Sequence, residues 1–200
     1  MAPQSDHTAG MRVSCLVVSR TASLLNRLSV SLASARAHWS GTDELLCSWN
    51  GSAEEEQRLR QDGMPRLRVV QHEPYHFARN MNALARQATG DVLALLNDDL
   101  ILDPGALDRG LSCLLSKPEV ALVGGRLRYS NGKLAHAGIL FAADGTPYNR
   151  LRPDRLGYVL EGEKTQGTDS GTIPAVTGAI MLIRRQHFLE LPFRETFDVC

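Results

Sequence analysis

Short, mostly apolar runs alternate with stretches of helical periodicity along the first 123 residues of the chain. The runs lie at residues 13–18, 44–48, 67–70, 92–96 and 120–123, and VLALL at 92–96 has no polar face at all. Continuous runs of this length are typical of strands that are buried on both faces of a parallel sheet. Between them, residues such as Leu25, Leu28 and Leu32 recur at helical spacing. This alternation predicts an α/β fold with right-handed crossovers, a mainly parallel central sheet and flanking helices.

The pattern changes after residue 124. Residues 126–129 and 134–140 flank Asn131-Gly132, the favoured two-residue turn, and predict a β-hairpin. Residues 145–172 are rich in Gly, Pro, Asp and Arg without a clear period, so we expect a long loop or a lid there. A strand at 176–183 and a short helix at 184–191 follow. Earlier in the chain, Asp103-Pro104 predicts the cap and first turn of a helix.

Composition excludes several classes of protein. Lys plus Arg and Asp plus Glu both total 22, which argues against binding nucleic acid or an anionic membrane through bulk charge. The four cysteines are scattered, so we expect neither a disulfide framework nor a structural zinc site, and a reducing compartment is the natural setting. No apolar run approaches the roughly 18 residues of a transmembrane helix. We therefore expect a flexible tail at 1–11, a globular domain at 12–200, and a cytoplasmic location.

Polar clusters follow three of the predicted strands, and ligands of open α/β sheets bind beyond the carboxyl ends of strands. The clusters are Ser19-Arg20, Asn50-Gly51-Ser52 and Asn97-Asp98-Asp99. The adjacent carboxylates of Asp98 and Asp99 would repel each other, and a hard divalent cation such as Mg²⁺ or Mn²⁺ relieves that repulsion. The alternative is a polar turn in which Asp99 is merely solvated.

Other motifs are absent or ambiguous. Neither G-x-x-x-x-G-K-[ST], G-x-G-x-x-G nor G-x-S-x-G occurs, which disfavours P-loop, dinucleotide-binding and serine hydrolase functions. The apolar stripe of one helix includes Phe77 and Met81 and is expected to face the core. Arg79 and Asn82 lie off this stripe, so we expect them to project toward solvent or a cleft. There Arg79 would pair with a diphosphate and Asn82 would bind a base or ribose; the alternative is a solvated helix face. We interpret His136 as structural rather than catalytic.

Taken together, these segments resemble glycosyltransferase family 2, and in particular its bacterial rhamnosyltransferase-like and polysaccharide-synthesis members. The resemblance covers about residue 12 to the end and rests on four stretches in order: NGS at 50–52, PYHFARNMNALARQATGDVLALLNDD at 74–99, PEVALVGGRLRYSNGKLAHAGILF at 118–141, and PAVTGAIMLIRRQHF at 174–188. It implies a GT-A (Rossmann-like) fold, here incomplete at its C-terminus. The nucleotide half would span about 12–124 and the sugar or acceptor half about 125–200.

The resemblance also implies roles for individual residues. Asn97-Asp98-Asp99 occupies the position of the family's DxD-type motif, so Asp99 would hold Mn²⁺ or Mg²⁺ on the donor diphosphate, with Asp98 contacting the ribose or a metal-bound water. The donor site would further include Ser19, Arg20, Asn50, Arg79, Asn82 and Asn97. Thr177 and Gly178 would line the sugar and acceptor side. The chemistry would be inverting displacement at the anomeric carbon of a nucleotide-diphospho-sugar.

Three departures from the family pattern stand out. Trp49 replaces the aspartate that commonly precedes Asn-Gly-Ser, and Asn97 replaces the first DxD aspartate. The acidic segment that supplies the general base is expected beyond Cys200; Asp198 lies near that position without matching the base, and Arg194 stands where the family has an aspartate. Inverting transfer needs such a base near the acceptor hydroxyl.

These observations leave three hypotheses. The first is a metal-dependent glycosyltransferase acting on a cell-surface glycan or a lipid-linked acceptor, located in the cytoplasm or at the inner face of the plasma membrane. The second is a catalytically impaired domain that binds a nucleotide sugar. The third, a nucleotidylyltransferase, ranks last because residues 18–21 lack the Gly-rich phosphate loop of that class.

Overall fold

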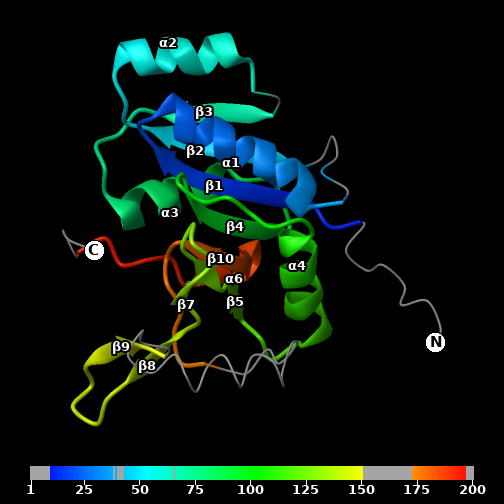
Figure 1. Cartoon of the computed structure of the whole chain (residues 1–200), viewed down its shortest axis with the longest axis vertical. Helices are drawn as coiled ribbons and strands as arrows, with labels where there is room; N and C mark the ends of the chain where they lie inside the picture. Colours follow the sequence, from blue (N-terminus) through cyan, green and yellow to red (C-terminus); the bar gives the residue numbers. More distant parts are fainter. Residues whose placement is uncertain (1–9, 38, 40–42, 65, 151–172, 197–200) are drawn as a thin grey trace. The chain divides into compact units, whose positions relative to one another are not determined.

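The chain folds into the alternation of strands and helices expected from its apolar runs (Figure 1). The computed structural model describes residues 10–37, 39, 43–64, 66–150 and 173–196. These residues fall into two units: those up to 123 together with those from 179 onward form the first, and those between 124 and 178 form the second. The chain after residue 178 returns to the first unit, and the nucleotide half expected at about 12–124 and the sugar or acceptor half expected at about 125–200 stay a prediction.

The first unit is built on a six-stranded sheet in the order β3-β2-β1-β4-β10-β5. β1 pairs in parallel with β2 and β4, β2 pairs in parallel with β3, and β10 pairs antiparallel with β4. The mainly parallel α/β sheet is therefore confirmed, and the strand order reverses between β1 and β4. The strands are β1 (Val13–Ser19), β2 (Glu44–Trp49), β3 (Leu67–Gln71), β4 (Val92–Asn97), β5 (Leu122–Gly124) and β10 (Ile180–Arg184).

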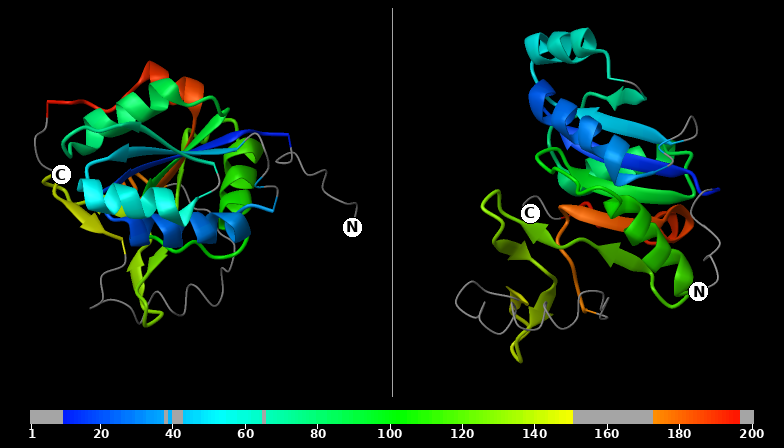
Figure 2. Two further views of the ribbon diagram at one scale, coloured as in Figure 1. Left: turned by 90° about the horizontal axis from the view of Figure 1, so that it is seen from above. Right: turned by 45° about the vertical axis from the view of Figure 1, so that its right-hand side comes forward.

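Helices cover both faces of this sheet, which is why its central strands are continuously apolar. Figure 2 shows α1 (Ala22–Ala35) and α4 (Ala106–Ser116) on one face, with α3 (Phe77–Gln87) and α6 (Arg185–Glu190) on the other. α2 (Ala53–Asp62) packs against α1. Leu25, Leu28 and Leu32 of α1 are fully buried, as their spacing predicts. Among the described helices, none has the length and apolarity needed to cross a bilayer.

The second unit contains two small antiparallel hairpins. β6 (Leu127–Arg128) pairs with β7 (Leu134–His136), as predicted, and β8 (Ile139–Phe141) pairs with β9 (Pro147–Asn149). The predicted two-residue turn is wrong: Tyr129 N–H donates to the Lys133 carbonyl at 2.8 Å, which closes a three-residue loop. Gly132 ends that loop at φ 81°, the left-handed conformation typical of three-residue hairpins.

Several predicted boundaries also differ from the structure. The expected strand at 134–140 breaks at Gly138, whose φ of 113° favours glycine. β9 lies inside the stretch expected to be a loop at 145–172, of which residues 151–172 lie outside the described part of the chain. The strand expected at 176–183 begins only at Ile180.

The helix after Asp103-Pro104 begins later than expected. The Asp103 carbonyl accepts from Ala106 N–H at 3.0 Å, so Asp103 and Pro104 belong to a turn. Gly105, at φ 69°, then caps α4 in place of Asp103.

Candidate functional site

The carboxyl ends of β1 and β4 are joined by a side-chain hydrogen bond. Ser19 ends β1 and is 3% exposed; its Oγ donates to Asp98 Oδ2 at 2.7 Å. Asn97, the last residue of β4, donates its backbone N–H to the Ala179 carbonyl at 2.9 Å. Because the strand order reverses between β1 and β4, this is the switch point at which open α/β sheets bind ligands. Ser19 therefore orients Asp98 at the predicted position.

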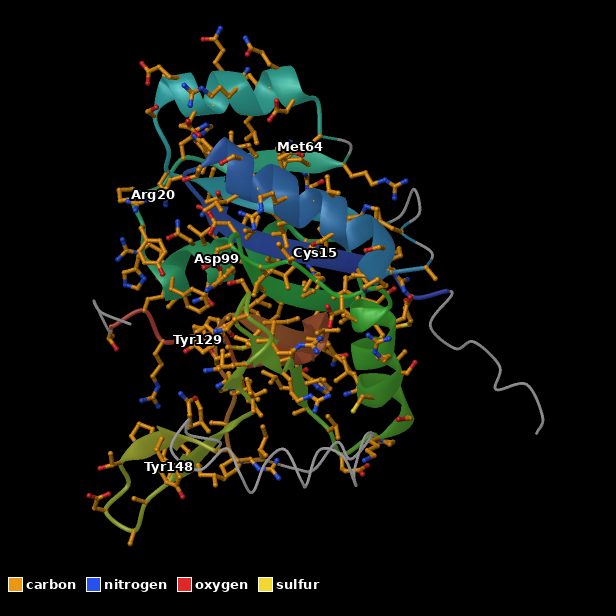
Figure 3. All side chains as sticks on the ribbon, viewed as in Figure 1. Cys15, Arg20, Met64, Asp99, Tyr129 and Tyr148 are labelled. Atoms are coloured by element: carbon orange, nitrogen blue, oxygen red, sulfur yellow. The ribbon has the colours of Figure 1, made fainter. Side chains whose placement is uncertain are left out.

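Asp99 differs from Asp98 in being exposed and, within the described part of the chain, without a hydrogen bond or ion pair. Figure 3 places Asp99 and Arg20 on the side toward which β1 runs, while Cys15 lies further back along that strand. The exposed Arg20 side chain directly follows Ser19. The structure thus places Ser19, Asp98 and Asp99 at one edge of the sheet, with Arg20 beside them.

A pocket of about 140 Å³ opens at this edge. The adjacent polar triplet at 97–99 forms one side of it. The rest of the lining is apolar or aromatic and comes from Val18, Tyr75, Phe77, Met81 and Leu96. Carboxylates beside apolar and aromatic side chains are the usual composition of a small-molecule site.

Tyr75 is the pocket residue that the sequence analysis missed. It lies between β3 and α3, and its side chain is 67% exposed although it lines the pocket. The signal available in the sequence was an aromatic residue in the loop directly before a predicted helix. Phe77 and Met81 were predicted only as residues of the helix core.

The turn after β2 is held tightly against the end of β1. Asn50 N–H donates to the Ser19 carbonyl at 2.9 Å, and Asn50 Nδ2 donates to the Glu73 carbonyl at 3.1 Å. A Cβ atom at Gly51 would lie 2.4 Å from the Arg20 carbonyl oxygen and 2.5 Å from Trp49 Cζ2, so only glycine fits. Asn50 therefore orders the β2 and β3 ends of this edge through both its backbone and its amide.

Trp49 fills the position at which the family pattern has a carboxylate. It is 1% exposed, and its Nε1–H is buried without a hydrogen-bond partner among the described residues. The indole packs beneath Gly51 and offers no carboxylate at the end of β2. The expected loss of an acidic contact at this position follows from that packing.

The amino terminus of α1 is already occupied by an acidic side chain. Glu55 Oε2 of α2 accepts from the backbone N–H of Ala22 at 2.8 Å. Thr21, the residue before the helix, makes no side-chain cap hydrogen bond. A carboxylate here complements the helix dipole, so this helix end is not open to a phosphate.

Asn82 was expected to project toward solvent or a cleft, and that prediction is wrong. The residue is 3% exposed, and its Nδ2 donates to the Phe193 carbonyl and to Glu195 Oε1, both at 2.8 Å. Its Oδ1 accepts from Phe193 N–H at 3.1 Å. Asn82 therefore holds the segment after α6, which leaves its amide no free donor for a nucleotide.

Arg79 is exposed as expected, and its guanidinium lies near the 193–195 segment. Its Nε lies 3.9 Å from Glu195 Oε2. Phe193 packs against Phe77 at a centroid distance of 5.5 Å and edge-on against Phe188 at 5.2 Å. Because Phe77 also lines the pocket, the 193–195 segment is one side chain away from it.

The Cys47 thiol, near the carboxyl edge of the sheet, is unreactive at neutral pH. Burial raises the pKa of Cys47 to about 12, and the nearby charge of Asp98 adds to the rise. The backbone hydrogen bond with Ser19 opposes this shift but does not outweigh it. Cys47 is therefore protonated at neutral pH and is not a nucleophile.

The chemistry of the donor set fits a hard divalent cation. Asp98 and Asp99 supply carboxylate oxygens at the pocket rim, and the described residues contain no cluster of three or more His, Cys, Asp or Glu that would form a closed cage. Mg²⁺ and Mn²⁺ sites of this kind use one or two carboxylates and complete their shell with water and substrate phosphates.

Thr177 and Gly178 belong to the second unit. Thr177 N–H donates to His136 Nε2 at 3.2 Å, and Gly178 is the last residue before the chain re-enters the first unit. His136 is 5% exposed and makes hydrogen bonds within its unit, in keeping with the structural role predicted for it.

The family model for glycosyl transferase family 2 matches residues 16–191. The chain belongs to that family. Among curated proteins it is 30% identical over 196 residues to the O-antigen biosynthesis protein RfbC of Myxococcus xanthus, and 30% identical over 158 residues to the uncharacterized protein y4gI of Sinorhizobium fredii (strain NBRC 101917 / NGR234). These matches cover 94% and 74% of this chain but only 15% and 17% of the relatives.

Solved glycosyltransferase structures confirm the GT-A fold. The mannosyltransferase PcManGT from Pyrobaculum calidifontis, in complex with GDP-Man and Mn²⁺, matches with a TM-score of 0.60 at 17% identity, over 93% of this chain and 48% of that one. Residues 1–349 of S. aureus TarS match with a TM-score of 0.54 at 15% identity, over 95% of this chain and 52% of that one. At these identities the likeness establishes the fold.

Proposed function

We propose that this family 2 domain binds a nucleotide-diphospho-sugar through a divalent cation and transfers the sugar, with inversion, to a glycan or lipid-linked acceptor. The observation that carries the proposal is the pair of adjacent carboxylates at the switch point of the sheet. Ser19 orients Asp98, Asp99 is left exposed, and both carboxylates line the pocket at this edge.

Each predicted residue has a proposed task. Asp99 and Asp98 hold Mn²⁺ or Mg²⁺ against the donor diphosphate, and Arg20 and Arg79 supply positive charge near it. Asn50 and Asn97 offer amide groups at the same edge, and the role of Thr177 and Gly178 on the sugar and acceptor side stays a prediction. Asn82 is not proposed as a donor contact, because its amide is engaged with the 193–195 segment.

The proposed chemistry breaks one bond and forms another at the anomeric carbon. The acceptor oxygen attacks that carbon, the bond to the diphosphate oxygen breaks, and the leaving nucleoside diphosphate keeps the electron pair. Arg20 and Arg79 would stabilise the developing negative charge, and a cation held by Asp98 and Asp99 would supply Lewis-acid stabilisation of the same charge. The acceptor proton needs a general base, which we expect in the family's acidic segment beyond Cys200.

The relatives support this proposal in two ways. The name of the Myxococcus protein connects a relative of this chain to O-antigen biosynthesis, a polysaccharide pathway. The Pyrobaculum enzyme, which shares the fold, binds GDP-Man with Mn²⁺. We propose the same ligand classes here, and the cytoplasmic location stays a prediction.

The test is a thermal-shift panel of UDP, dTDP and GDP, each with Mn²⁺ or with EDTA. A ligand at about 100 times its dissociation constant adds roughly 2.7 kcal/mol to the free energy of unfolding, which is an easily measured shift. We expect one nucleotide to stabilise the chain and EDTA to abolish the effect. Asp99→Ala should abolish it as well, while the matched variant Asp91→Ala at the opposite edge of the sheet should keep it.

The outcomes separate the hypotheses. Metal-dependent binding with turnover of a sugar donor supports the transferase, and binding without turnover supports an impaired nucleotide-sugar-binding domain. If Asp99→Ala binds nucleotide and Mn²⁺ as well as wild type does, the site assignment is wrong.

A further inference from the structure

A mostly exposed aromatic side chain lines the pocket at the carboxyl edge of the sheet. Tyr75 shares this lining with Asp98 and Asp99, and 67% of it is exposed. Neither of the aromatic pairs found among the described residues includes Tyr75, so no other ring covers its faces. Because single exposed aromatic side chains are common on protein surfaces, the deciding observation is how this one is held.

The backbone on the amino side of Tyr75 is anchored to the end of β2. Asn50 Nδ2 donates to the Glu73 carbonyl at 3.1 Å. The next residue, Pro74, has a φ fixed by its ring and also restricts the backbone of Glu73. The chain therefore reaches Tyr75 with little rotational freedom.

The backbone on the carboxyl side is anchored through a fully buried amide. Asn80 Oδ1 accepts from His76 N–H at 2.6 Å, and Asn80 Nδ2 donates to Ser48 Oγ at 2.7 Å. Gln71 Nε2 donates to the same hydroxyl at 2.8 Å, which connects β3 to this point as well. The His76 side chain caps α3, because its Nδ1 accepts from Arg79 N–H at 3.2 Å. Both the backbone and the side chain of residue 76 are thus fixed.

A fixed, exposed ring in a largely apolar pocket suits a flat aromatic ligand. Away from residues 97–99, the rest of the lining is Val18, Phe77, Met81 and Leu96, which carry no hydrogen-bonding side chain. The hydroxyl groups of a sugar ring would lose water there without gaining side-chain partners. A nucleobase has two π-faces that stack on an aromatic side chain, and an anchored backbone lowers the entropic cost of that stacking.

We propose that Tyr75 stacks on the nucleobase of the donor. The proposal rests on the function proposed above, in which a cation on Asp98 and Asp99 holds the donor diphosphate. With the diphosphate at the carboxylates, the base occupies the part of the pocket that Tyr75 lines. Every base has a π-face, so Tyr75 supplies affinity for the nucleoside and does not select one base over another.

The experiment measures the dissociation constants of UDP, dTDP, GDP and inorganic pyrophosphate, each with Mn²⁺, for the whole chain. For a nucleotide that binds, Tyr75→Ala should raise Kd roughly tenfold or more, because base–aromatic stacking is lost. Tyr75→Phe keeps the ring and should bind within about twofold of wild type. Pyrophosphate has no base, so Tyr75→Ala should change its Kd by less than about twofold.

Tyr129→Ala is the matched control. Tyr129 is 58% exposed in the β6–β7 loop and does not line the pocket, so its loss should leave every Kd unchanged. Since both tyrosines are exposed, neither alanine variant should lose more than about 0.5 kcal/mol of the free energy of unfolding. Thermal unfolding without ligand checks that both variants are folded.

Proton NMR of the bound nucleotide tests the stacked geometry directly. With Mg²⁺ in place of the paramagnetic Mn²⁺, base protons that lie over the face of an aromatic ring shift upfield. We expect this shift in wild type and in Tyr75→Phe, and its loss in Tyr75→Ala. Base protons that bind without an upfield shift in wild type would overturn the proposal.

The outcomes separate the stacking role from the function on which it rests. If no nucleotide binds with metal, the proposed function fails and the stacking role fails with it. If a nucleotide binds equally well to wild type and Tyr75→Ala, or if Tyr75→Ala weakens pyrophosphate as much as the nucleotide, the donor site stands and the stacking role is overturned. If Tyr75→Ala weakens UDP-glucose or GDP-mannose but not UDP or GDP, the ring contacts the sugar, which also overturns it.

Discussion

At the amino edge of the six-stranded sheet, charged side chains bind one another, whereas at the carboxyl edge the adjacent carboxylates face a pocket. The residues just before β2 and β4 are Asp43 and Asp91, and each is paired with an arginine. Arg36 Nε lies 3.0 Å from Asp43 Oδ2, with both side chains almost fully buried. Arg12 Nη2 lies 3.2 Å from Asp91 Oδ1 at the surface.

Glu44, the first residue of β2, illustrates how completely the amino edge is satisfied. Its Oε1 accepts from Ser14 Oγ at 2.7 Å, from Thr89 N–H at 2.7 Å and from Thr89 Oγ1 at 3.0 Å. Its other oxygen lies 3.3 Å from Arg68 Nη2. One carboxylate thus connects β1, β2, β3 and the residues before β4.

The carboxyl edge offers the opposite arrangement. Asp98 receives one hydrogen bond, from Ser19, and Asp99 makes none among the described residues. Two adjacent carboxylates without cationic partners cost stability, and that cost is relieved when a cation binds. The charged residues before the strands are thus satisfied within the fold, whereas Asp99 after β4 is left accessible for the proposed ligand.

Among the variants that test this comparison, Arg36→Met should have the largest effect on the free energy of unfolding. The substitution removes the guanidinium that lies against the buried Asp43 carboxylate, and breaking a buried ion pair typically costs about 3–5 kcal/mol. Arg36 Nη1 also lies 3.0 Å from Asp108 Oδ1, so the bond between α1 and α4 is lost as well. Chemical denaturation at neutral pH should show the loss in the free energy of unfolding.

The matched variant is Arg20→Met, the same substitution at the carboxyl edge. Because Arg20 is exposed, the free energy of unfolding of the variant should differ from wild type by no more than about 0.5 kcal/mol. Its nucleotide binding should weaken. Adding Asp43→Asn to Arg36→Met removes the buried negative charge as well and should recover part of the stability. Equal destabilisation by Arg36→Met and Arg20→Met would contradict the division between the two edges.

The next effect concerns the 193–195 segment, which borders the pocket through Phe193 and Phe77. Asn82→Asp removes both amide donors and places a carboxylate next to Glu195, so we expect a loss of about 1–3 kcal/mol. Hydrogen exchange at the Phe193 amide, which bonds to Asn82 Oδ1, should become faster. Measurement of both quantities separates a local opening from global destabilisation.

Asn131→Asp provides the control for the same change of side chain. Asn131 is exposed in the β6–β7 loop, and its Oδ1 accepts from Lys133 N–H at 3.0 Å, a role that aspartate also fills. Its stability should stay within about 0.5 kcal/mol of wild type. An Asn82→Asp protein as stable as Asn131→Asp would show that the 193–195 segment is held by the aromatic contacts alone.

Much of the fold was predictable because local sequence and burial agree. β1 and β4 are buried on both faces, so their apolar runs are unbroken, and α2 begins where Ser52 Oγ accepts from Glu55 N–H at 3.3 Å. Predictions failed where a backbone conformation decided the outcome. The start of α4 depends on the left-handed Gly105, and the break before β8 depends on Gly138.

The site was predictable only as far as strand ends reveal it. The carboxyl ends of parallel strands meet at one edge, which is why Ser19 and Asp98 could be expected near each other. Asn82 bonds to residues 111 and 113 positions away, and no local pattern carries that information. Tyr75 was missed because its loop has no period, although the loop enters the pocket.

The smallest expected effect is the pH dependence contributed by Glu44. Partial burial raises the pKa of this carboxyl. The hydrogen bonds from Ser14 and Thr89 and the charge of Arg68 together lower the pKa by more than burial raises it, so the net shift is downward. Its stabilisation is therefore fully present above the unfolded pKa of about 4.3 and is lost as pH falls through the lower folded value. The size should be below about 1 kcal/mol, since part of the side chain is solvent-screened.

The measurement compares the unfolding free energy of wild type and Glu44→Gln from neutral pH into the acid range. The wild type should be the more stable protein at neutral pH, and the difference should shrink as acid protonates Glu44. Glu119→Gln, at an exposed position, controls for the loss of one negative charge. A difference that stays constant with pH would mean that the Glu44 bonds do not depend on its charge. The amino edge would then be stabilised by its arginine pairs, and the comparison with the carboxyl edge would rest on Arg36 and Asp43.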